Sequence, residues 1–369
     1  MSDIADLYKG TGISKDQLSD EGEPCILYGE LYTKYKSETI EKVISKTNID
    51  NTKLVRSKAN DVIIPCSGET AEDIATARCV LNDNILLGGD LNIIRLHGYD
   101  GTFMSYQLNG KRKYDIAKVA QGVSVVHLYG EHLKGVKTIN PCLEEQKKIA
   151  SLLFLLDERI ATQNKIIEDL KKLKSAIIEI EYTPNTKTTS HIGNVIEQIS
   201  KRNKNNAIQN VLSVSNRQGF IKQSDQFENR NVASEDTSNY KIVEKNDFAF
   251  NPARINVGSI ARLTTFEKGI VSPMYICFRT QENVALEYID FFFESKHFYC
   301  EIQKRLEGSV RQCLSFEGLC NIPFSLPSLE MQQRIGKRLF TLGQKIKTET
   351  DLLELLNKQK QYLLRQMFI

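Results

Sequence analysis

The stretch PCLEEQKKIASLLFLLDERIATQNKIIEDLKKLKSAIIEIEY, Pro141 to Tyr182, decides the fold of this chain. It contains no glycine, and no proline follows its first residue. Its apolar residues recur in alternating steps of three and four, as in the a/d seam of a coiled-coil helix, with polar interruptions at Gln163 and Lys174. The seam comprises Ile149, Leu153, Leu156, Ile160, Ile167, Leu170 and Ile177. About 38 residues predict a rod of roughly 57 Å, which needs a partner along its length.

The same pattern returns in the second half of the chain at one constant offset, which matches Pro141 to Pro327. In the helix, the matches are Leu143 with Leu329, Glu144 with Glu330, Gln146 with Gln332, Ile149 with Ile335, Leu153 with Leu339, Phe154 with Phe340, Leu156 with Leu342 and Ile160 with Ile346. The match also covers the lead-in, where Gly122, Leu128, Glu131 and Leu133 pair with Gly308, Leu314, Glu317 and Leu319. We therefore interpret the chain as a duplicated unit whose two long helices pack on each other.

Composition bounds the class of protein. The 369 residues allow two to three domains, and 41% hydrophobic with 26% charged residues is ordinary for a soluble protein. No apolar run is long enough for a transmembrane helix, and the N-terminus lacks the pattern of a secretory signal. The eight cysteines form no CxxC pair, which favours free thiols in a reducing cytoplasm. We expect a cytoplasmic protein without a membrane segment. The net charge of +3 does not by itself indicate a nucleic-acid partner.

The order of segments predicts an α+β fold in which two pseudo-symmetric globular domains alternate with two long helices that pack on each other. Frequent glycines and short apolar runs indicate a strand-rich domain over residues 1–140, followed by the first long helix at 141–182. A polar linker and a second domain occupy residues 183–326, and the second long helix occupies 327–369. Residues 286–306 of the second domain are more helical.

No catalytic pattern stands out. The chain lacks a GxxxxGK[ST] phosphate loop, and the spacing of its five scattered histidines does not predict a metal site. Asn251-Pro252-Ala253-Arg254 resembles the Asn-Pro-Pro-aromatic motif of adenine methyltransferases but lacks its second proline and its aromatic residue. Asp157 and Glu158 lie among lysines on the rod, which indicates a solvated face rather than an acid/base pair.

The motif P-x-L-x-x-Q-x-x-I at the start of a long helix, present twice and each time after a variable domain, resembles the specificity (S) subunit of type I restriction-modification systems. The resemblance covers essentially the whole chain. Residues 141–150 match the family's first conserved region closely, and residues 327–335 match the second more loosely, with Met331 and Gly336 departing from it. Residues 64–70, 250–260 and 308–311 are similar to recurrent stretches of the family's target-recognition domains.

The resemblance implies a non-catalytic subunit in which each globular domain reads one half of a bipartite, asymmetric DNA site. The two long helices would pack as an antiparallel coiled coil, hold the globular domains apart and set the spacer. Two methyltransferase (M) subunits would dock on the helices, and restriction (R) subunits would complete the complex. The M subunits, which carry S-adenosylmethionine, would methylate adenine, and this chain would hold no cofactor and no metal. A rod of roughly 57 Å is long enough to place two readers one DNA turn apart.

The candidate DNA-binding residues are basic and polar side chains of the two variable domains, because Arg and Lys contact phosphates and Arg or Asn read base edges. In the first domain they are Lys34, Tyr35, Lys36, Ser67, Gly68, Thr70, Lys111, Arg112 and Lys113. In the second they are Lys201, Arg202, Lys204, Asn216, Arg217, Arg254, Asn256 and Arg311. The alternatives are solvated surface lysines, a turn and helix cap at Ser67–Thr70, and a loop-holding role for Asn251 and Arg254.

The candidate partner-binding residues lie on the two rods: Gln146, Ile149, Leu153, Gln332, Ile335, Gly336, Leu339 and Gly343. Gly336 and Gly343 lie seven residues apart on one stripe and indicate the close approach of a neighbour, either the first rod or an M subunit. Two alternatives remain: a coiled-coil scaffold that does not bind DNA, or a subunit of a complex that only methylates. Salt-sensitive, sequence-dependent DNA binding separates the scaffold from the reader.

Overall fold

The structure is a computed structural model that describes residues 1–50, 53–122, 125–183, 189–216, 218–226, 236–308 and 312–368. It divides into two compact units, Met1–Lys165 with Thr350–Ile369, and Ile166–Glu349. Each unit contains one globular domain and part of both long helices. Within the described ranges, no helix combines the length and apolar character needed to cross a bilayer.

Two long helices follow the two prolines that the repeat matches, Pro141 and Pro327. Helix α6 spans Leu143–Tyr182 over 40 residues, and α11 spans Leu329–Gln366 over 38 residues. Each begins two residues after its proline, because a proline disfavours helical geometry in the residue before it and donates no backbone hydrogen bond. Acidic residues occupy both first turns, where the helix dipole stabilises negative charge. The predicted long helices are confirmed.

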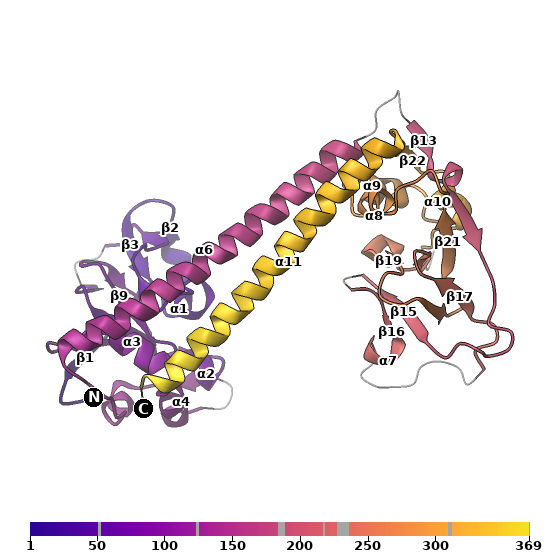
Figure 1. The fold of residues 1–369 in the computed structure, drawn as a ribbon. Coiled ribbons are helices and arrows are strands. Elements are labelled where there is room, and N and C mark those ends of the chain that lie inside the picture. The colour runs from indigo at the N-terminus through magenta and orange to yellow at the C-terminus, as the bar shows by residue number, and fades with distance from the viewer. Residues whose placement is uncertain are drawn as a thin grey trace. The chain divides into compact units, whose positions relative to one another are not determined.

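In the first unit, the start of α6 packs against the end of α11. Ala150 and Leu153 of α6 share one buried cluster with Leu364 of α11 and with Phe368, which follows that helix. In the second unit, the end of α6 packs near the start of α11: Ile177 and Tyr182 share a core with Ile335 and Leu339. The two helices therefore run antiparallel in both units, as predicted (Figure 1).

The first globular domain contains two five-stranded sheets. The order in one is β1-β11-β7-β9-β4, with bounds Ala5–Lys9, Leu91–Leu96, Asp61–Pro65, Arg78–Val80 and Thr39–Ile40. The order in the other is β2-β5-β3-β10-β6, with bounds Leu18–Ser19, Ser45–Thr47, Glu23–Ile26, Leu86–Leu87 and Val55–Arg56. A ribbon joins β8 (Ser67–Gly68) to β12 (Val126–His127). The short helices are η1 (Lys15–Gln17), α1 (Glu30–Thr33), α2 (Ala71–Ile74), α3 (Gly101–Asn109), α4 (Lys113–Val119) and α5 (Gly130–Lys134).

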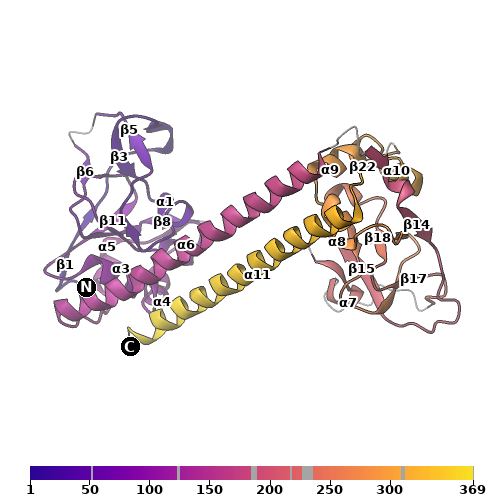
Figure 2. The ribbon, with the colours of Figure 1, turned by 45° about the horizontal axis from the view of Figure 1, so that its top comes forward.

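The second globular domain, in which Figure 2 labels β14, β15, β17 and β18, contains two four-stranded sheets. The order in one is β14-β21-β18-β19, with bounds Ile196–Ile199, Ile276–Thr280, Phe248–Phe250 and Ile260–Arg262. The order in the other is β16-β15-β20-β17, with bounds Gly219–Lys222, Val211–Ser215, Lys268–Val271 and Lys241–Glu244. β13 (Thr189–His191) pairs with β22 (Pro323–Ser325). The helices are η2 (Ile192–Asn194), α7 (Gln223–Gln226), η3 (Ile255–Val257), α8 (Leu286–Phe292), α9 (Lys296–Gln303) and α10 (Phe316–Cys320).

The two domains share one scaffold. In the first, the buried Asp61 carboxylate accepts two hydrogen bonds from Arg95, at 2.9 and 2.7 Å. In the second, Asp247, which the repeat matches to Asp61, accepts two from Arg279, at 2.7 and 3.2 Å. Asp61 begins β7 and Asp247 directly precedes β18, and a two-pronged bond to arginine holds each of these inner strands to a neighbour. The duplication read from the helices therefore extends into the globular cores.

The structure refines one expectation from the sequence and corrects another. The helical region predicted over 286–306 is split between α8 and α9, because Ser295 caps the second helix by accepting a hydrogen bond from the Phe298 N–H. The solvated face predicted for Asp157 is wrong, because its side chain is only 10% exposed. Its carboxylate lies 2.6 Å from the Lys360 ammonium and accepts a hydrogen bond from the Tyr106 hydroxyl at 2.7 Å.

Candidate nucleic-acid interface

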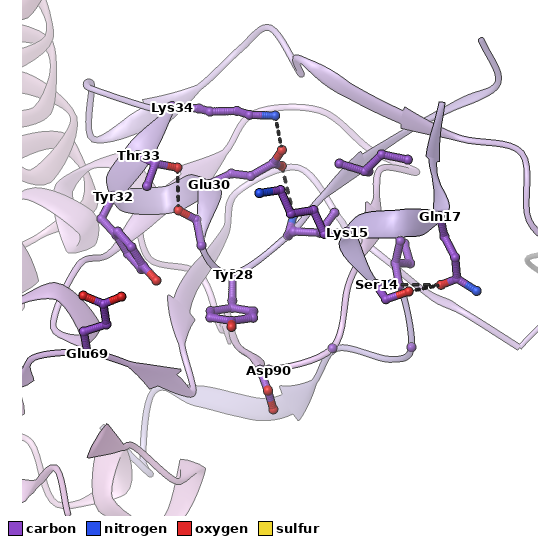
Figure 3. Close-up of a pocket in the computed structure, with 16 residues that line it drawn as sticks. Ser14, Lys15, Gln17, Tyr28, Glu30, Tyr32, Thr33, Lys34, Glu69 and Asp90 are labelled. Atoms are coloured by element: carbon purple, nitrogen blue, oxygen red, sulfur yellow. Dashed lines mark hydrogen bonds and ion pairs between the residues drawn. The ribbon is translucent and has the colours of Figure 1, made fainter. Parts of the chain in front are cut away.

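A hollow of about 880 Å³ opens in the first globular domain (Figure 3). Its wall combines the segment after β1, the end of β3 with α1, the turn before β11 and the residue that follows β8. The side chains that matter most below are Lys15, Tyr28, Tyr32, Lys34, Glu69 and Asp90. This mixture of aromatic rings, carboxylates and lysines offers both stacking surface and hydrogen-bonding groups.

Glu69 is the exposed carboxylate of this hollow. It follows β8 directly and lies near the Tyr32 ring (Figure 3). Among the described residues, its side chain has no hydrogen-bonded or ion-paired partner. Burial raises the pKa of Tyr32, and the neighbouring Tyr28, Asp73 and Glu69 add to the effect, so this phenol stays protonated and can donate a hydrogen bond. The hollow thus presents a carboxylate acceptor beside a phenol donor.

Of the residues predicted to bind DNA in the first domain, only Lys34 lines this hollow, and Glu30 holds its ammonium at 2.6 Å. Tyr35 is buried, and its hydroxyl accepts a hydrogen bond from the Ile44 N–H. Ser67 is buried and donates to Asp90, while Thr70 caps α2 by accepting from the Asp73 N–H. These three side chains support the local fold. Their contact with DNA stays a prediction, and so does DNA contact by the exposed Lys36 and by Gly68.

Lys111, Arg112 and Lys113 form a separate group at the junction of α3 and α4, and Lys113 is the first residue of α4. A Cβ on the preceding Gly110 would lie 2.9 Å from the Leu364 carbonyl oxygen, so this group adjoins the end of α11 rather than the hollow. Arg112 is paired with Asp115 at 3.4 Å, whereas Lys111 is exposed. The structure therefore separates the predicted residues of the first domain into two groups.

The second domain has a basic hollow of about 870 Å³. It gathers Lys201, Arg202 and Lys204, all predicted from sequence, with Lys268 of β20. The buried Asn203 fixes this loop, because its amide donates to the Ile208 carbonyl and accepts from the Ile208 N–H at 3.0 and 3.1 Å. Lysine and arginine side chains held around one hollow form a surface suited to phosphate groups.

A second group lies at the other end of β15. Asn216 follows that strand, and a Cβ on Gly258 would lie 3.7 Å from the Asn216 Cβ. Gly258 closes the turn that contains Arg254 and Asn256, and its φ of 87° lies in the left-handed region that glycine adopts most readily. The Arg254 side chain is exposed and has no hydrogen-bonded partner among the described residues. The predicted Arg217 and Arg311 lie outside the described residues.

Gln146 and Gln332, predicted as partner contacts, are each 1% exposed. The Gln146 amide donates to the Pro141 carbonyl at 2.7 Å and accepts from the Asp100 N–H at 2.9 Å. Gln332 repeats this arrangement with the Pro327 carbonyl and the Ala285 N–H, at 2.9 and 3.0 Å. Each glutamine therefore connects the start of a long helix to the start of α3 or α8. The repeated glutamine of the motif has an intramolecular role.

The other predicted partner contacts divide by burial. Leu153, Ile335 and Leu339 lie in the cores beneath the helices, and Ile149 is half-buried. A Cβ on Gly336 would lie 2.8 Å from Glu287 Cβ and 3.1 Å from the Tyr288 nitrogen, so the neighbour that requires this glycine is α8. The sequence leaves that choice open between the first rod and an M subunit, and neither is the neighbour found here. A Cβ on Gly343 would meet nothing within 4 Å.

Sequence reasoning missed Glu69, Tyr28, Tyr32 and Lys268. Glu69 lies inside the stretch 64–70, but the candidates were chosen mainly for basic charge, a signal that a carboxylate lacks. The two tyrosines carry no signal in the sequence, since only α1 and the turn at Asp90 bring them beside Glu69. Within the described ranges, no cluster of three or more His, Cys, Asp or Glu residues is arranged to hold a metal ion.

Comparison with known proteins decides the family. The family model described as "Type I restriction modification DNA specificity domain" matches residues 1–172 and again residues 177–358. The chain belongs to this family. Two matches in one chain, together spanning nearly all of it, agree with the duplicated scaffold. As a type I specificity subunit, the chain is the DNA-recognition component of its system and not the catalytic one.

A curated relative of this specificity subunit is the type I restriction enzyme MjaVIII specificity subunit of Methanocaldococcus jannaschii. It is 24% identical over 368 residues, covering 91% of this chain and 82% of the relative. Among solved structures, the S subunit of the type I restriction-modification system from M. genitalium matches with a TM-score of 0.63 and 17% identity. That match covers 100% of this chain and 94% of the other.

A further solved structure concerns complex assembly and conformational transition of the type I R-M system. It matches this specificity subunit with a TM-score of 0.53 at 13% identity, covering 98% of this chain and 94% of the other. At such low identities, the two structural matches establish a shared fold. The predicted α+β fold, with two target-recognition domains and two long helices, is confirmed.

Proposed function

We propose that each globular domain of this specificity subunit reads one half of a bipartite, asymmetric DNA site. One observation carries the proposal: a single chain holds two copies of one scaffold, with the same buried Asp–Arg bond, but different side chains on its loops. Identical scaffolds hold their loops in the same way, while different loops select different bases. The expected target is two unlike half-sites separated by bases that the protein does not read.

The two long helices would set the length of that spacer and dock two M subunits. The M subunits would bind S-adenosylmethionine and methylate one adenine in each half-site, and R subunits would add DNA translocation and cleavage. We place this complex in the cytoplasm, where bacterial and archaeal genomes lie. One structural relative comes from a study of the assembly of a type I complex, and this similarity supports an assembly role for the present chain.

We place the docking of M subunits on an outer patch that each helix repeats, defined as Leu143 and Phe154 in α6, and Leu329 and Phe340 in α11. Leu143 and Leu329 are 40% and 41% exposed, and Phe340 is 50% exposed. Eleven residues complete about three helical turns, so the two members of each pair share one face. Two identical partners require one surface presented twice, and these apolar positions are both accessible to solvent and repeated.

A map of N6-methyladenine tests the reader proposal. The genome is sequenced for methylation in cells that express the partner M subunit with and without this chain. We expect one split motif to lose methylation when the chain is absent. Replacing residues 191–326 with those of another specificity subunit should then change one half of the motif and leave the other half intact. An unchanged map would contradict sequence reading by this chain.

The alternative, a scaffold that does not bind DNA, makes a different prediction in solution. A reader complex should lose affinity linearly in log K against log salt concentration, because phosphate contacts release counterions. It should also prefer its own motif over a scrambled duplex of the same length. A scaffold would show neither behaviour. The basic hollow that contains Lys201, Arg202, Lys204 and Lys268 favours the reader.

A further inference from the structure

The loops at residues 66–70 and 252–256 occupy the same place in the two domains. In the first, the Leu128 N–H donates to the Cys66 carbonyl at 2.8 Å. In the second, the Leu314 N–H donates to the Pro252 carbonyl at 3.0 Å. The two donors, Leu128 and Leu314, are matched by the same sequence offset that relates the two long helices, and so are the two acceptors, Cys66 and Pro252. The two loops therefore leave equivalent strands, β7 and β18, from equivalent anchor points.

The strands beside these loops also correspond. β3 pairs in parallel with β10, where Cys25 aligns with Leu86. β15 pairs in parallel with β20, where Val211 aligns with Ile270. The segment after β3 lines the hollow that contains Glu69, and Asn216 after β15 adjoins the turn that contains Arg254. Each domain thus places its loop next to the end of the same strand.

The equivalent loops carry opposite charges. Residues 66–70 read Cys-Ser-Gly-Glu-Thr, and residues 252–256 read Pro-Ala-Arg-Ile-Asn. Glu69 and Arg254 are the exposed charged side chains of their loops, although Arg254 corresponds in position to Gly68. Within the described part of the chain, neither side chain has a hydrogen-bonded or ion-paired partner. Folding therefore does not require either charge, and the two loops suit different ligands.

We infer that these two loops read bases in the two half-sites, with Glu69 accepting a hydrogen bond from cytosine N4 and Arg254 donating to guanine O6 and N7. This inference rests on the proposed function, in which each globular domain reads one half-site. Arginine matches the paired acceptors of guanine, and a carboxylate matches the amino group of cytosine. Adenine suits Glu69 less well, because its N7 acceptor lies beside the amino group and repels the carboxylate.

The surroundings of Glu69 fit this reading. A carboxylate near phosphates is repelled unless it gains an amino group, so Glu69 rejects bases that present only acceptors. Lys15 lines the same hollow and would offset that repulsion by contacting a phosphate, whereas the Lys34 ammonium is already paired with Glu30. Tyr32, protonated and close to Glu69, adds a donor for a neighbouring acceptor (Figure 3). The hollow therefore contains both groups that position DNA and groups that select a base.

The test changes each charge and maps the motif that is methylated. Glu69→Gln and Arg254→Ala are expressed separately with the partner M subunit, and N6-methyladenine is mapped genome-wide. We expect Glu69→Gln to relax one C·G position in one half of the motif, and Arg254→Ala to relax one C·G position in the other half. A discrimination of about 1–3 kcal/mol corresponds to roughly 5- to 150-fold between bases. The spacer and the opposite half should not change.

Two controls remove exposed charges outside the loops. Glu131→Gln acts on an exposed glutamate paired with Lys134 in the first domain, and Lys245→Ala acts on an exposed lysine paired with Glu267 in the second. Both should leave the motif unchanged. If a loop variant abolishes methylation, the purified complex is tested by competition with duplexes that differ from the motif at single base pairs. A lost preference at one position supports the inference, and equal weakening at all positions overturns it.

The outcomes separate the inference from the proposed function. If the unmodified chain directs no split motif, the reader proposal itself fails. If it directs a split motif that both loop variants leave intact, the reader proposal stands and the base-reading loops are elsewhere. An A·T pair at the position that responds to Glu69→Gln would also overturn the assignment to cytosine.

Discussion

At the scale of single residues, buried polar groups fix how each long helix meets its domain. Gln146 and Gln332 each satisfy one carbonyl of the helix lead-in and one N–H at the start of α3 or α8. A buried amide with both bonds made specifies one orientation, because any shift leaves polar atoms unpaired. The repetition of these glutamines in the sequence therefore reflects the helix–domain junction.

Lys360 makes a second buried polar contact that the two units do not share. Its ammonium lies 2.7 Å from Glu38 and 2.6 Å from Asp157, with side-chain exposures of 12%, 8% and 10%. Burial raises the pKa of Glu38, and the ammonium of Lys360 opposes that rise. In the second unit the counterpart of Lys360 is Lys174, which pairs with Glu294, and Gly343 replaces Asp157. The ionic cluster is thus specific to the first unit.

Lys360→Met should destabilise the first unit by about 3–5 kcal/mol at pH 7.5, because two buried carboxylates lose their counter-charge. Without the ammonium, the folded-state pKa of Glu38 rises further, because only burial and the neighbouring Asp157 carboxylate then act on it. A raised carboxyl pKa means that stability is lost as pH rises through it, so the defect should shrink at pH 5. Hydrogen exchange of residues 150–160 in urea measures this locally.

The matched control is Lys358→Met, since Lys358 and Glu354 form an exposed pair, 69% and 66% exposed. Exposed pairs contribute little, so this variant should behave like the unmodified protein. Equal effects of the two substitutions would contradict a special role for the buried cluster.

At the scale of elements, each long helix has an inner and an outer face. The inner face carries the seam: Leu153, Leu156, Ile167 and Ile177 are all less than 9% exposed. The outer face carries exposed apolar residues, among them Leu143, Leu329 and Phe340 of the outer patch, whose fourth member, Phe154, is half-buried. The seam residues recur in both long helices because both helices pack on globular domains. Burial does not explain why the exposed apolar residues also recur in both helices. Docking of two M subunits supplies an explanation.

Leu143→Glu and Leu329→Glu should each lower the number of bound M subunits from two to one, and the double variant should bind none. A charge placed in an apolar contact is desolvated without a partner, which is costly. Native mass spectrometry of the co-expressed complex measures the stoichiometry. Leu355→Asp is the control, because Leu355 is 62% exposed and its repeat counterpart is already Asp169. Loss of M subunits in the control would contradict the assignment.

At the scale of the whole molecule, the proposed spacer follows from helix length. An antiparallel pair changes length without losing its seam only if both helices gain whole heptads. One heptad adds about 10.5 Å to each helix, which equals roughly three base pairs of DNA. Adding or removing heptads in both helices should therefore change the spacer length in steps of about three base pairs, while the sequences of both half-sites remain the same.

Insertion of one heptad into α6 after Lys165 and one into α11 before Thr350, at the division between the two units, should lengthen the methylated motif's spacer by about three base pairs. Insertion into one helix alone should abolish methylation, because the two seams then fall out of register. Methylation mapping measures both. A spacer that stays constant after the double insertion would show that the helices do not set it.

Much of this architecture could be predicted from the sequence, because repetition and periodicity are local in the chain. The constant offset of the repeat, the seam in 141–182 and the two prolines predicted both helices and their packing. Helices α3 and α4 were missed, since they are short, begin beside glycine or arginine, and gain stability from tertiary contacts. Phe103 and Tyr106 of α3 pack with Leu364 of α11, and Ile116 of α4 lies in the core of the first domain. Short helices depend on tertiary packing more than on propensity.

The sequence by itself thus determined the duplication, the family and the two helices, because each is written as a pattern in consecutive residues. Only the tertiary structure decided which residues face solvent at the candidate sites. In the folded chain Gln146, Gln332 and Tyr35 are buried, and Asp157 is a buried partner of Lys360. The neighbour that lies against Gly336 is α8. The tertiary structure also placed Glu69 beside Tyr32 of α1, in a hollow that Tyr28 shares. Burial and proximity depend on contacts between segments far apart in the chain, and a local pattern does not record them.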